Sequence, residues 1–99
     1  MARWVWDARK ALANVRSHKV GFELAQRIFG DPDVVSRCDP YPGEQRWQSI
    51  GRPSAASELV LFVVHTEPVR QAEGETVGRI ISARKATSHE RKAYEEGEF

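Results

Sequence analysis

The fold of this chain is decided by one stretch, Glu58-Leu59-Val60-Leu61-Phe62-Val63-Val64-His65-Thr66. Six apolar residues follow one another from Leu59 to Val64, without the alternation expected of a strand that has one face in water. This is also the longest apolar run in the sequence. We therefore expect residues 58–66 to form the central strand of a sheet that is covered on both faces.

Two helices are predicted upstream of this strand. Asp7 is a good N-cap because its carboxylate can accept hydrogen bonds from the amides of a first helical turn, and a helix over about residues 8–18 is expected to follow. The residues that share its apolar face lie at helical spacing: Ala8, Ala11, Leu12 and Val15. A second helix is predicted from Phe22 to Phe29, because Gly30-Asp31-Pro32 suits a helix end.

Shorter strands are predicted on either side of the central one. Alternation in Arg3-Trp4-Val5-Trp6 predicts an edge strand at the N-terminus. The segments expected to form further strands are Val34–Val35, Arg46–Ile50 ending at Gly51, and Val77–Ala83. Residues 67–76 are polar, and they are predicted to connect the central strand to the last strand in a hairpin.

The last element begins with a capping box, Thr87-Ser88-His89-Glu90, in which the Thr hydroxyl and the Glu carboxylate each satisfy a backbone amide. A helix from there through about Glu96 is predicted. The chain is thus expected to be a single domain over residues 1–99 of the α+β class. Two N-terminal helices and a C-terminal helix would pack on one face of an antiparallel sheet.

Charge is distributed unevenly along the chain. The sequence has 15 Lys and Arg against 14 Asp and Glu, which gives a formal net charge of +1. Residues 1–19 carry a local charge of +4, residues 79–92 carry another +4, and the remainder sums to −7. The total argues against a strongly basic nucleic-acid binder, but the two basic segments predict a local cationic surface if they meet in the fold.

Cysteine usage and apolar runs indicate the cellular setting. A single cysteine, Cys38, excludes an intramolecular disulfide and a cysteine-rich zinc site, and it is interpreted as a bystander. No apolar run has the length of a signal peptide or a membrane span. We therefore expect a reduced, cytoplasmic location.

Polar residues gather at the ends of the strands that are expected to be central. His65 and Glu67 end the apolar strand, and their spacing of two places them on one face. Arg79 and Arg84 flank the apolar pair in the last strand. If these strands pair, groups that can move a proton meet fixed cations, which suits phosphoryl transfer. The alternative is that His65 satisfies a buried position and that the arginines are solvated or paired with acids.

Several short motifs follow one another in a characteristic order. Those in the first part of the chain are Trp6-Asp7, Lys10-Ala11, Asn14, His18 and Phe22-Glu23-x-Ala25. Those in the second part are Glu44-x-Arg46-Trp47, Val63-Val64-His65-Thr66-Glu67, Arg79-Ile80-Ile81-Ser82-Ala83-Arg84-Lys85-Ala86-Thr87, Glu90-Arg91 and Tyr94. Together they cover nearly the whole chain, and in this order they resemble the BrnT family of toxins from type II toxin–antitoxin pairs.

The resemblance implies a compact fold similar to the RelE and ParE toxins. It also implies a metal-independent endoribonuclease that needs no cofactor, inhibits translation and is neutralised by a BrnA-type DNA-binding antitoxin. In such a reaction the 2′-hydroxyl of the RNA attacks the adjacent phosphorus and leaves a 2′,3′-cyclic phosphate and a 5′-hydroxyl. The residues that the resemblance assigns to catalysis are Arg84, Arg79, His65 and Glu67. Those assigned to RNA binding are Lys10, His18, Arg46 and Lys85.

The chain departs from the family pattern at two places. The family usually has a Lys-His-Gly turn after the first helix, whereas Ser17-His18-Lys19 is followed here by a glycine only at position 21. The segment between Glu67 and Arg79 is longer than the family's and acidic. It either tunes access to the RNA site or belongs to the antitoxin interface.

Two other functions stay open at the level of sequence. One is a non-enzymatic toxin that, like ParE, poisons DNA gyrase by binding it. The other is an interaction module that binds nucleic acid or a protein partner without turnover. His65 and Glu67 beside the arginines favour the enzyme, because a binding surface does not need groups that transfer protons.

Overall fold

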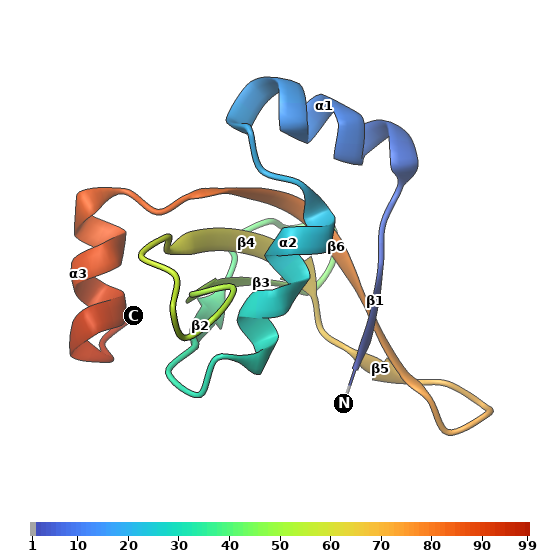
Figure 1. Cartoon of the computed structure of the whole chain (residues 1–99). Helices are drawn as coiled ribbons and strands as arrows, with labels where there is room; N and C mark the ends of the chain where they lie inside the picture. Colours follow the sequence, from blue (N-terminus) through green and yellow to red (C-terminus); the bar gives the residue numbers. More distant parts are fainter. Residues whose placement is uncertain (1) are drawn as a thin grey trace.

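The computed structural model describes residues 2–99, and within them six strands form one mixed sheet (Figure 1). The strands follow one another across the sheet in the order β1, β6, β4, β3, β2, and β5 pairs with the beginning of β6. Their bounds are β1 Arg3–Val5, β2 Val35–Cys38, β3 Arg46–Gly51, β4 Leu61–Thr66, β5 Val69–Arg70 and β6 Thr76–Lys85.

The strand β4 lies at the centre of the sheet and is covered on both faces, as the uninterrupted apolar run predicts. Leu61 and Val63 belong to a buried cluster with Phe22 and Ile28. Phe62, which points the other way, belongs to a second cluster that includes Tyr94 of the C-terminal helix. We call these two sides of the sheet the α2 face and the α3 face.

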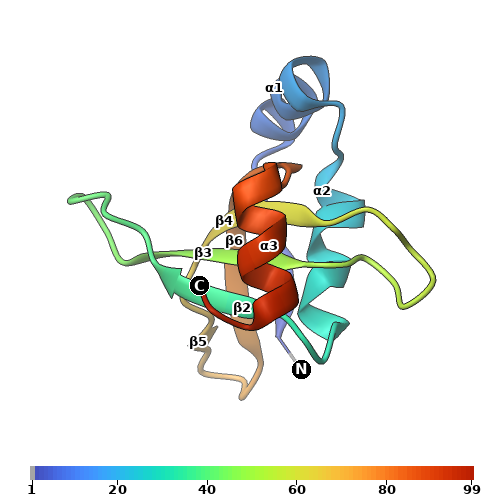
Figure 2. The same cartoon turned by 90° about the vertical axis from the view of Figure 1, so that its left-hand side faces the viewer.

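The helices are α1 (Ala8–His18), α2 (Phe22–Ala25), the 3₁₀ helix η1 (Gln26–Gly30) and α3 (Ser88–Glu96). The predicted bounds of α1 and the capping box of α3 are confirmed. The second predicted helix continues as η1 from residue 26. The expectation that all helices share one sheet face is wrong, because α2 and α3 lie on opposite faces (Figure 2).

The sheet is mixed, which corrects the prediction of an antiparallel sheet. The edge strand β1 runs parallel to β6, with Trp4 opposite Gly78. The indole of Trp4 covers Gly78 so closely that a Cβ there would collide with it. The polar connection after β4 also contains a short strand, β5, whose Val69 and Arg70 pair with the start of β6.

The helix α1 is turned differently from the predicted orientation. Of the four residues on its apolar face, Ala11 packs against the core, whereas Leu12 and Val15 are exposed. Asn14 is buried instead, and its side chain bonds to the backbone of Ala83 and Val20. The helix α1 lies at the top of the molecule in Figures 1 and 2, and neither figure shows another element covering its outer side.

A β-bulge in β6 decides which side chains share a face. Val64 pairs with Ser82 and His65 pairs with Ile80, so Ile81 is the additional residue. In a regular strand of the same sequence, residues 79 and 84 would lie on opposite faces, because they are an odd number of positions apart. The bulge therefore places Arg79 and Arg84 on the same side, the α3 face.

Among residues 2–99, no helix is both long and apolar enough to span a membrane.

Candidate active site

The α3 face consists of three rows of paired side chains. The first row, Val35, Ile50, Phe62 and Arg84, lies at the end of the sheet where α3 and Phe99 pack. The second row contains Arg37, Gln48, Val64 and Ser82. The third row contains Arg46 and Thr66, and Thr66 accepts a hydrogen bond from the backbone of Arg79 at 2.9 Å. Arginines are thus concentrated on the α3 face, and the helix α3 covers only one end of that face.

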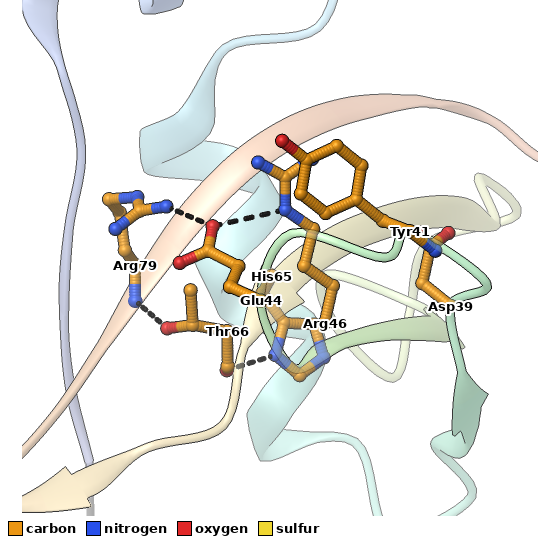
Figure 3. A network of polar contacts seen from close by, with 7 residues as sticks. All are labelled: Asp39, Tyr41, Glu44, Arg46, His65, Thr66 and Arg79. Carbon is orange, nitrogen blue, oxygen red and sulfur yellow. Dashed lines mark hydrogen bonds and ion pairs between the residues drawn. The ribbon is translucent and has the colours of Figure 1, made fainter.

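A carboxylate joins two of these arginines in the third row (Figure 3). Oε1 of Glu44 accepts hydrogen bonds from Nε of Arg46 at 3.1 Å and from Nη2 of Arg79 at 2.6 Å. The bond from Arg46, together with the charge of Arg79, lowers the pKa of Glu44 below its ordinary value of 4.5. Glu44 is therefore ionised at neutral pH, and it is an anion held by two guanidinium groups.

An aromatic ring covers one of the two guanidiniums. The guanidinium carbon of Arg46 lies 3.7 Å from the centre of the Tyr41 ring, which is the stacked arrangement of a cation–π contact (Figure 3). The turn that carries the ring is stabilised by Asp39, whose carboxylate accepts from the Tyr41 amide at 3.1 Å. The ring lies close over Gly43, so a Cβ there would require the tyrosine side chain to shift. Loop residues 39–45 thus bring Tyr41 and Glu44 onto the end of the sheet.

Arg84 has a different partner from Arg79. Its two terminal nitrogens bond to both carboxylate oxygens of Glu90, at 2.7 and 2.9 Å, and its guanidinium lies 4.1 Å from the centre of the Phe62 ring. The hydrogen bonds to Glu90 raise the pKa of Arg84. The two arginines are roughly 15 Å apart along β6 at about 3.3 Å per residue, so the structure does not place them on one phosphate.

His65 lies on the α2 face, away from the arginines. It is 5% exposed, its Nε2 is 2.6 Å from Oγ of Ser49, and its Nδ1 is 2.8 Å from the carbonyl oxygen of Thr66. Its ring contacts Trp4 and Phe29 edge-on. Burial lowers the pKa of His65, and the neutral ring is a hydrogen-bonded part of the core. The expected meeting of His65 with Arg79 and Arg84 is therefore wrong.

The other residues that the sequence singled out are dispersed. Glu67 follows β4 and is exposed, outside the network around Glu44. Lys10 and His18 are exposed on α1, and Lys85 is exposed at the end of β6, opposite Leu61 and thus on the α2 side. Of the residues expected to bind RNA, Arg46 lies in the arginine-rich part of the α3 face.

Three residues of this surface were not predicted as site residues: Glu44, Tyr41 and Arg37. Glu44 lies in a turn-rich segment, where periodicity gives no orientation. Its spacing of two from Arg46 is the signal that could have identified it, because alternate residues entering a strand lie on one side. Arg37 needs the register of β2 with β3, where it pairs with Gln48 and donates to its side chain at 2.8 Å.

A hollow of the described surface lies away from these arginines. It has a volume of about 770 Å³ and is lined by residues that include Asp31, Arg52 and Tyr94. The hydroxyl of Tyr94 donates to Asp31 at 2.6 Å, and burial with this bond raises the pKa of Tyr94 to about 12. Acids and bases are mixed in this hollow, so it lacks the cationic character of the surface around Arg46 and Arg79.

Comparison with known proteins identifies the family of the chain. No curated protein matches the chain. A family model described as the ribonuclease toxin, BrnT, of the type II toxin–antitoxin system matches residues 6–90, a span that includes Glu44, Arg46 and Arg79. The chain therefore belongs to the BrnT family of ribonuclease toxins of type II toxin–antitoxin systems.

Proposed function

We propose that this toxin is a metal-independent endoribonuclease that cuts RNA by means of the RNA's own 2′-hydroxyl. The observation that carries the proposal is the Glu44 carboxylate held between the guanidiniums of Arg46 and Arg79 on an open sheet face. A base and two permanent cations within one hydrogen-bonded network are the groups that this reaction requires.

The arginines supply the electrostatic part of catalysis. A guanidinium donates through a planar fork that fits the oxygens of a carboxylate or a phosphate, and it keeps its charge at any working pH. Arg46 and Arg79 already bind one anion, the Glu44 side chain. When RNA binds, its scissile phosphate takes hydrogen bonds from the same two side chains, which then stabilise the negative charge that grows on the phosphoryl oxygens.

Glu44 supplies the proton acceptor. Its carboxylate removes the proton of the 2′-hydroxyl, the 2′-oxygen forms a bond to phosphorus, and the bond from phosphorus to the 5′-oxygen breaks. The leaving 5′-oxygen takes a proton from water, and Glu44 returns its proton to solvent. The products are a 2′,3′-cyclic phosphate and a 5′-hydroxyl, and DNA is resistant because it lacks the nucleophile.

This assignment moves proton transfer from His65 and Glu67 to Glu44. His65 has both ring nitrogens in hydrogen bonds and almost no exposed surface, so RNA cannot reach it without local unfolding. Tyr41 beside Arg46 offers a ring on which a nucleobase can stack. Arg84 is retained as a candidate for a flanking phosphate, because one more donor lies on the same face.

In the cell this activity would inhibit translation by destroying RNA, in the cytoplasm, with a fold of the RelE and ParE kind. An antitoxin would block this activity. The family membership implies such a partner, and we propose that it is of the BrnA type. The chain would act as one toxin domain over its length.

The test uses purified protein, a labelled RNA and EDTA, with the product ends identified by phosphatase and kinase treatment. Glu44→Gln is expected to lower the cleavage rate by about a hundredfold, the usual scale for a general base. This variant is also expected to bind RNA several-fold more tightly, because it lacks the negative charge that repels the phosphate. Arg79→Ala is expected to lower both cleavage and binding.

The matched controls are Glu23→Gln and Arg27→Ala, which change the same kinds of side chain at exposed positions of α2 and η1, on the other side of the sheet. Both are expected to cleave normally. Circular dichroism checks that every variant is folded. If RNA stays intact at high protein concentration, or if Glu44→Gln cleaves as fast as the unsubstituted protein, the proposed chemistry is wrong.

A further inference from the structure

The outer side of α1 has an apolar stripe without a partner in the described chain. Leu12 is 62% exposed and Val15 is 43% exposed, and Ala8 precedes them on the same side of the helix. Residues at these spacings normally face a core. Burying such side chains against a partner is favourable, so this helix retains apolar surface that a partner could bury.

The stripe is fixed in its exposed position by the buried side of the same helix. Nδ2 of Asn14 donates to the carbonyl oxygens of Val20 and Ala83 at 2.9 and 2.7 Å, and Oδ1 accepts from the Ala83 amide at 3.2 Å. Turning Leu12 inward would break all three hydrogen bonds inside the protein. The exposure of the stripe is therefore a property of the packed helix and not of a loosely attached one.

The charge beside the stripe has one sign. Arg9 and Arg16 border Leu12 at three and four positions, and Lys19 follows the helix. The single acid at this helix, Asp7, uses its carboxylate to cap the amides of residues 9 and 10. Within residues 2–99, none of these three cations takes part in an ion pair.

The helix α3 shows what a solvated charged face looks like in the same molecule. Arg91 pairs with Glu95 and Lys92 pairs with Glu96, each one turn away, so α3 neutralises its own surface. The unpaired cations of α1 lie instead around exposed aliphatic side chains. That combination is complementary to an apolar ridge flanked by carboxylates.

We propose that the stripe formed by Ala8, Leu12 and Val15, with Arg9, Arg16 and Lys19 at its border, is the docking site for an acidic amphipathic helix of the antitoxin. A second copy of this chain is disfavoured, because two such helices would bring cations together. RNA is disfavoured because Leu12 and Val15 offer nothing to a phosphate. The proposal uses the family's antitoxin and does not depend on the chemistry proposed for Glu44.

The experiment measures the affinity between this chain and the antitoxin encoded in the same operon, by isothermal titration calorimetry with both proteins purified. Leu12→Gln with Val15→Gln keeps good helix formers at exposed positions and is expected to weaken binding at least thirtyfold, as removal of central apolar anchors does. Arg9→Glu with Arg16→Glu is expected to weaken binding and to reduce its association rate at low salt.

The matched control is Val69→Gln with Arg70→Glu, which removes an exposed valine and reverses an arginine in β5. It is expected to bind the antitoxin normally, because the proposal places the interface on α1 and not on the acidic segment after β4. Weaker binding by this variant, with normal binding by the α1 variants, would overturn the proposal. RNA cleavage by the Leu12→Gln, Val15→Gln variant is expected to be unchanged, which separates this proposal from the proposed function. Unchanged antitoxin affinity in both α1 variants overturns it. So does a loss of RNA binding in the Arg9→Glu, Arg16→Glu variant with normal antitoxin affinity, because α1 would then serve the RNA.

Discussion

At the scale of single residues, the surroundings of Glu44 and His65 determine which of these two acid–base groups can meet a substrate. Glu44 is exposed and held by two guanidiniums that favour its charged form, with its pKa lowered. His65 is buried among aromatic rings that favour its neutral form, also with its pKa lowered. The first group can meet a substrate and the second contributes to folding stability.

The burial of His65 predicts a loss of stability in mild acid. In the unfolded chain His65 titrates near its ordinary pKa of 6.5, whereas in the folded chain its pKa is lower. Between these two values the unfolded chain binds a proton that the folded chain does not, so the free energy of unfolding decreases as the pH falls below about 6.5. Above that value the contribution of the neutral ring is complete.

Urea unfolding at pH 7.5 and pH 5.5 measures this effect. The unsubstituted protein is expected to lose more stability between the two pH values than His65→Gln, in which the titrating group is absent. The control is His89→Gln, which changes an exposed histidine at the start of α3. Equal losses in the unsubstituted protein and in His65→Gln would contradict the assignment of a neutral, buried ring.

The sequence allowed His65 to be identified as important but not as a core residue. A histidine two positions from Glu67 at a strand end has the same pattern whether it faces solvent or the core. Ser49, which bonds to its Nε2, comes from another strand, 16 positions away. Such pairings depend on register, and a single sequence does not specify the register of strands that are joined by long turns.

At the scale of elements, the orientation of α1 is decided by one polar side chain. The strand β1 pairs with β6 only as far as Arg79, and beyond it the outer edge of β6 would be unpaired. The amide of Asn14 binds the backbone N–H and C=O of Ala83 and so continues the edge where β1 ends. The side chain of Asn14 thus makes the hydrogen bonds to Ala83 that a neighbouring strand would otherwise make.

Asn14→Ala is therefore expected to destabilise the protein by about 2–3 kcal/mol, because buried backbone groups of Ala83 and Val20 lose their partners. Asn14→Asp should also destabilise it, since a carboxylate cannot donate to the two carbonyls. Chemical denaturation measures both changes. Ser17→Ala, on the exposed part of the same helix, should stay within about 0.5 kcal/mol of the unsubstituted protein, and a similar cost there would contradict this role for Asn14.

Local signals predicted the existence and the ends of elements better than their orientation. Asp7 and Thr87 predicted the starts of α1 and α3 because a capping bond involves neighbours in the sequence. The apolar spacing of α1 predicted the wrong buried face, since the interaction that orients the helix is made by Asn14 with a residue 69 positions away. Parallel pairing of β1 is likewise a long-range property.

At the scale of the whole molecule, the two basic segments differ in whether their cations form ion pairs. In the second segment, Arg79 pairs with Glu44, Arg84 with Glu90 and Arg91 with Glu95. In the first segment the cations of α1 have no acidic partner among the described residues. The segments adjoin where α1 packs on β6. They nevertheless form two separate surfaces, one with cations paired to acids and one whose cations have no acidic partner among the described residues, and not one uniform cleft.

The proposed RNA surface predicts a moderate dependence of binding on salt. If Arg37, Arg46 and Arg79 contact about three phosphates, the logarithm of affinity should fall with the logarithm of salt with a slope of about −2. Affinity should then fall roughly 20-fold between 50 and 200 mM salt. Fluorescence anisotropy with a labelled RNA and Glu44→Gln, which binds without fast cleavage, measures this slope. A slope near zero would contradict an electrostatic RNA site.

The bulge at Ile81 sets which residues of β6 face the core and which lie on the arginine-bearing side. If all ten residues of β6 alternated regularly at the present length, Ser82 and Arg79 would lie on opposite faces. With Ser82 held opposite Val64, Arg79 would then turn toward the side of Trp4 and Ile80 would leave the core. Loss of Ile81 itself would remove the bulge and keep both faces, so evolution can shorten the strand at this position without exchanging its arginine-bearing side for its core.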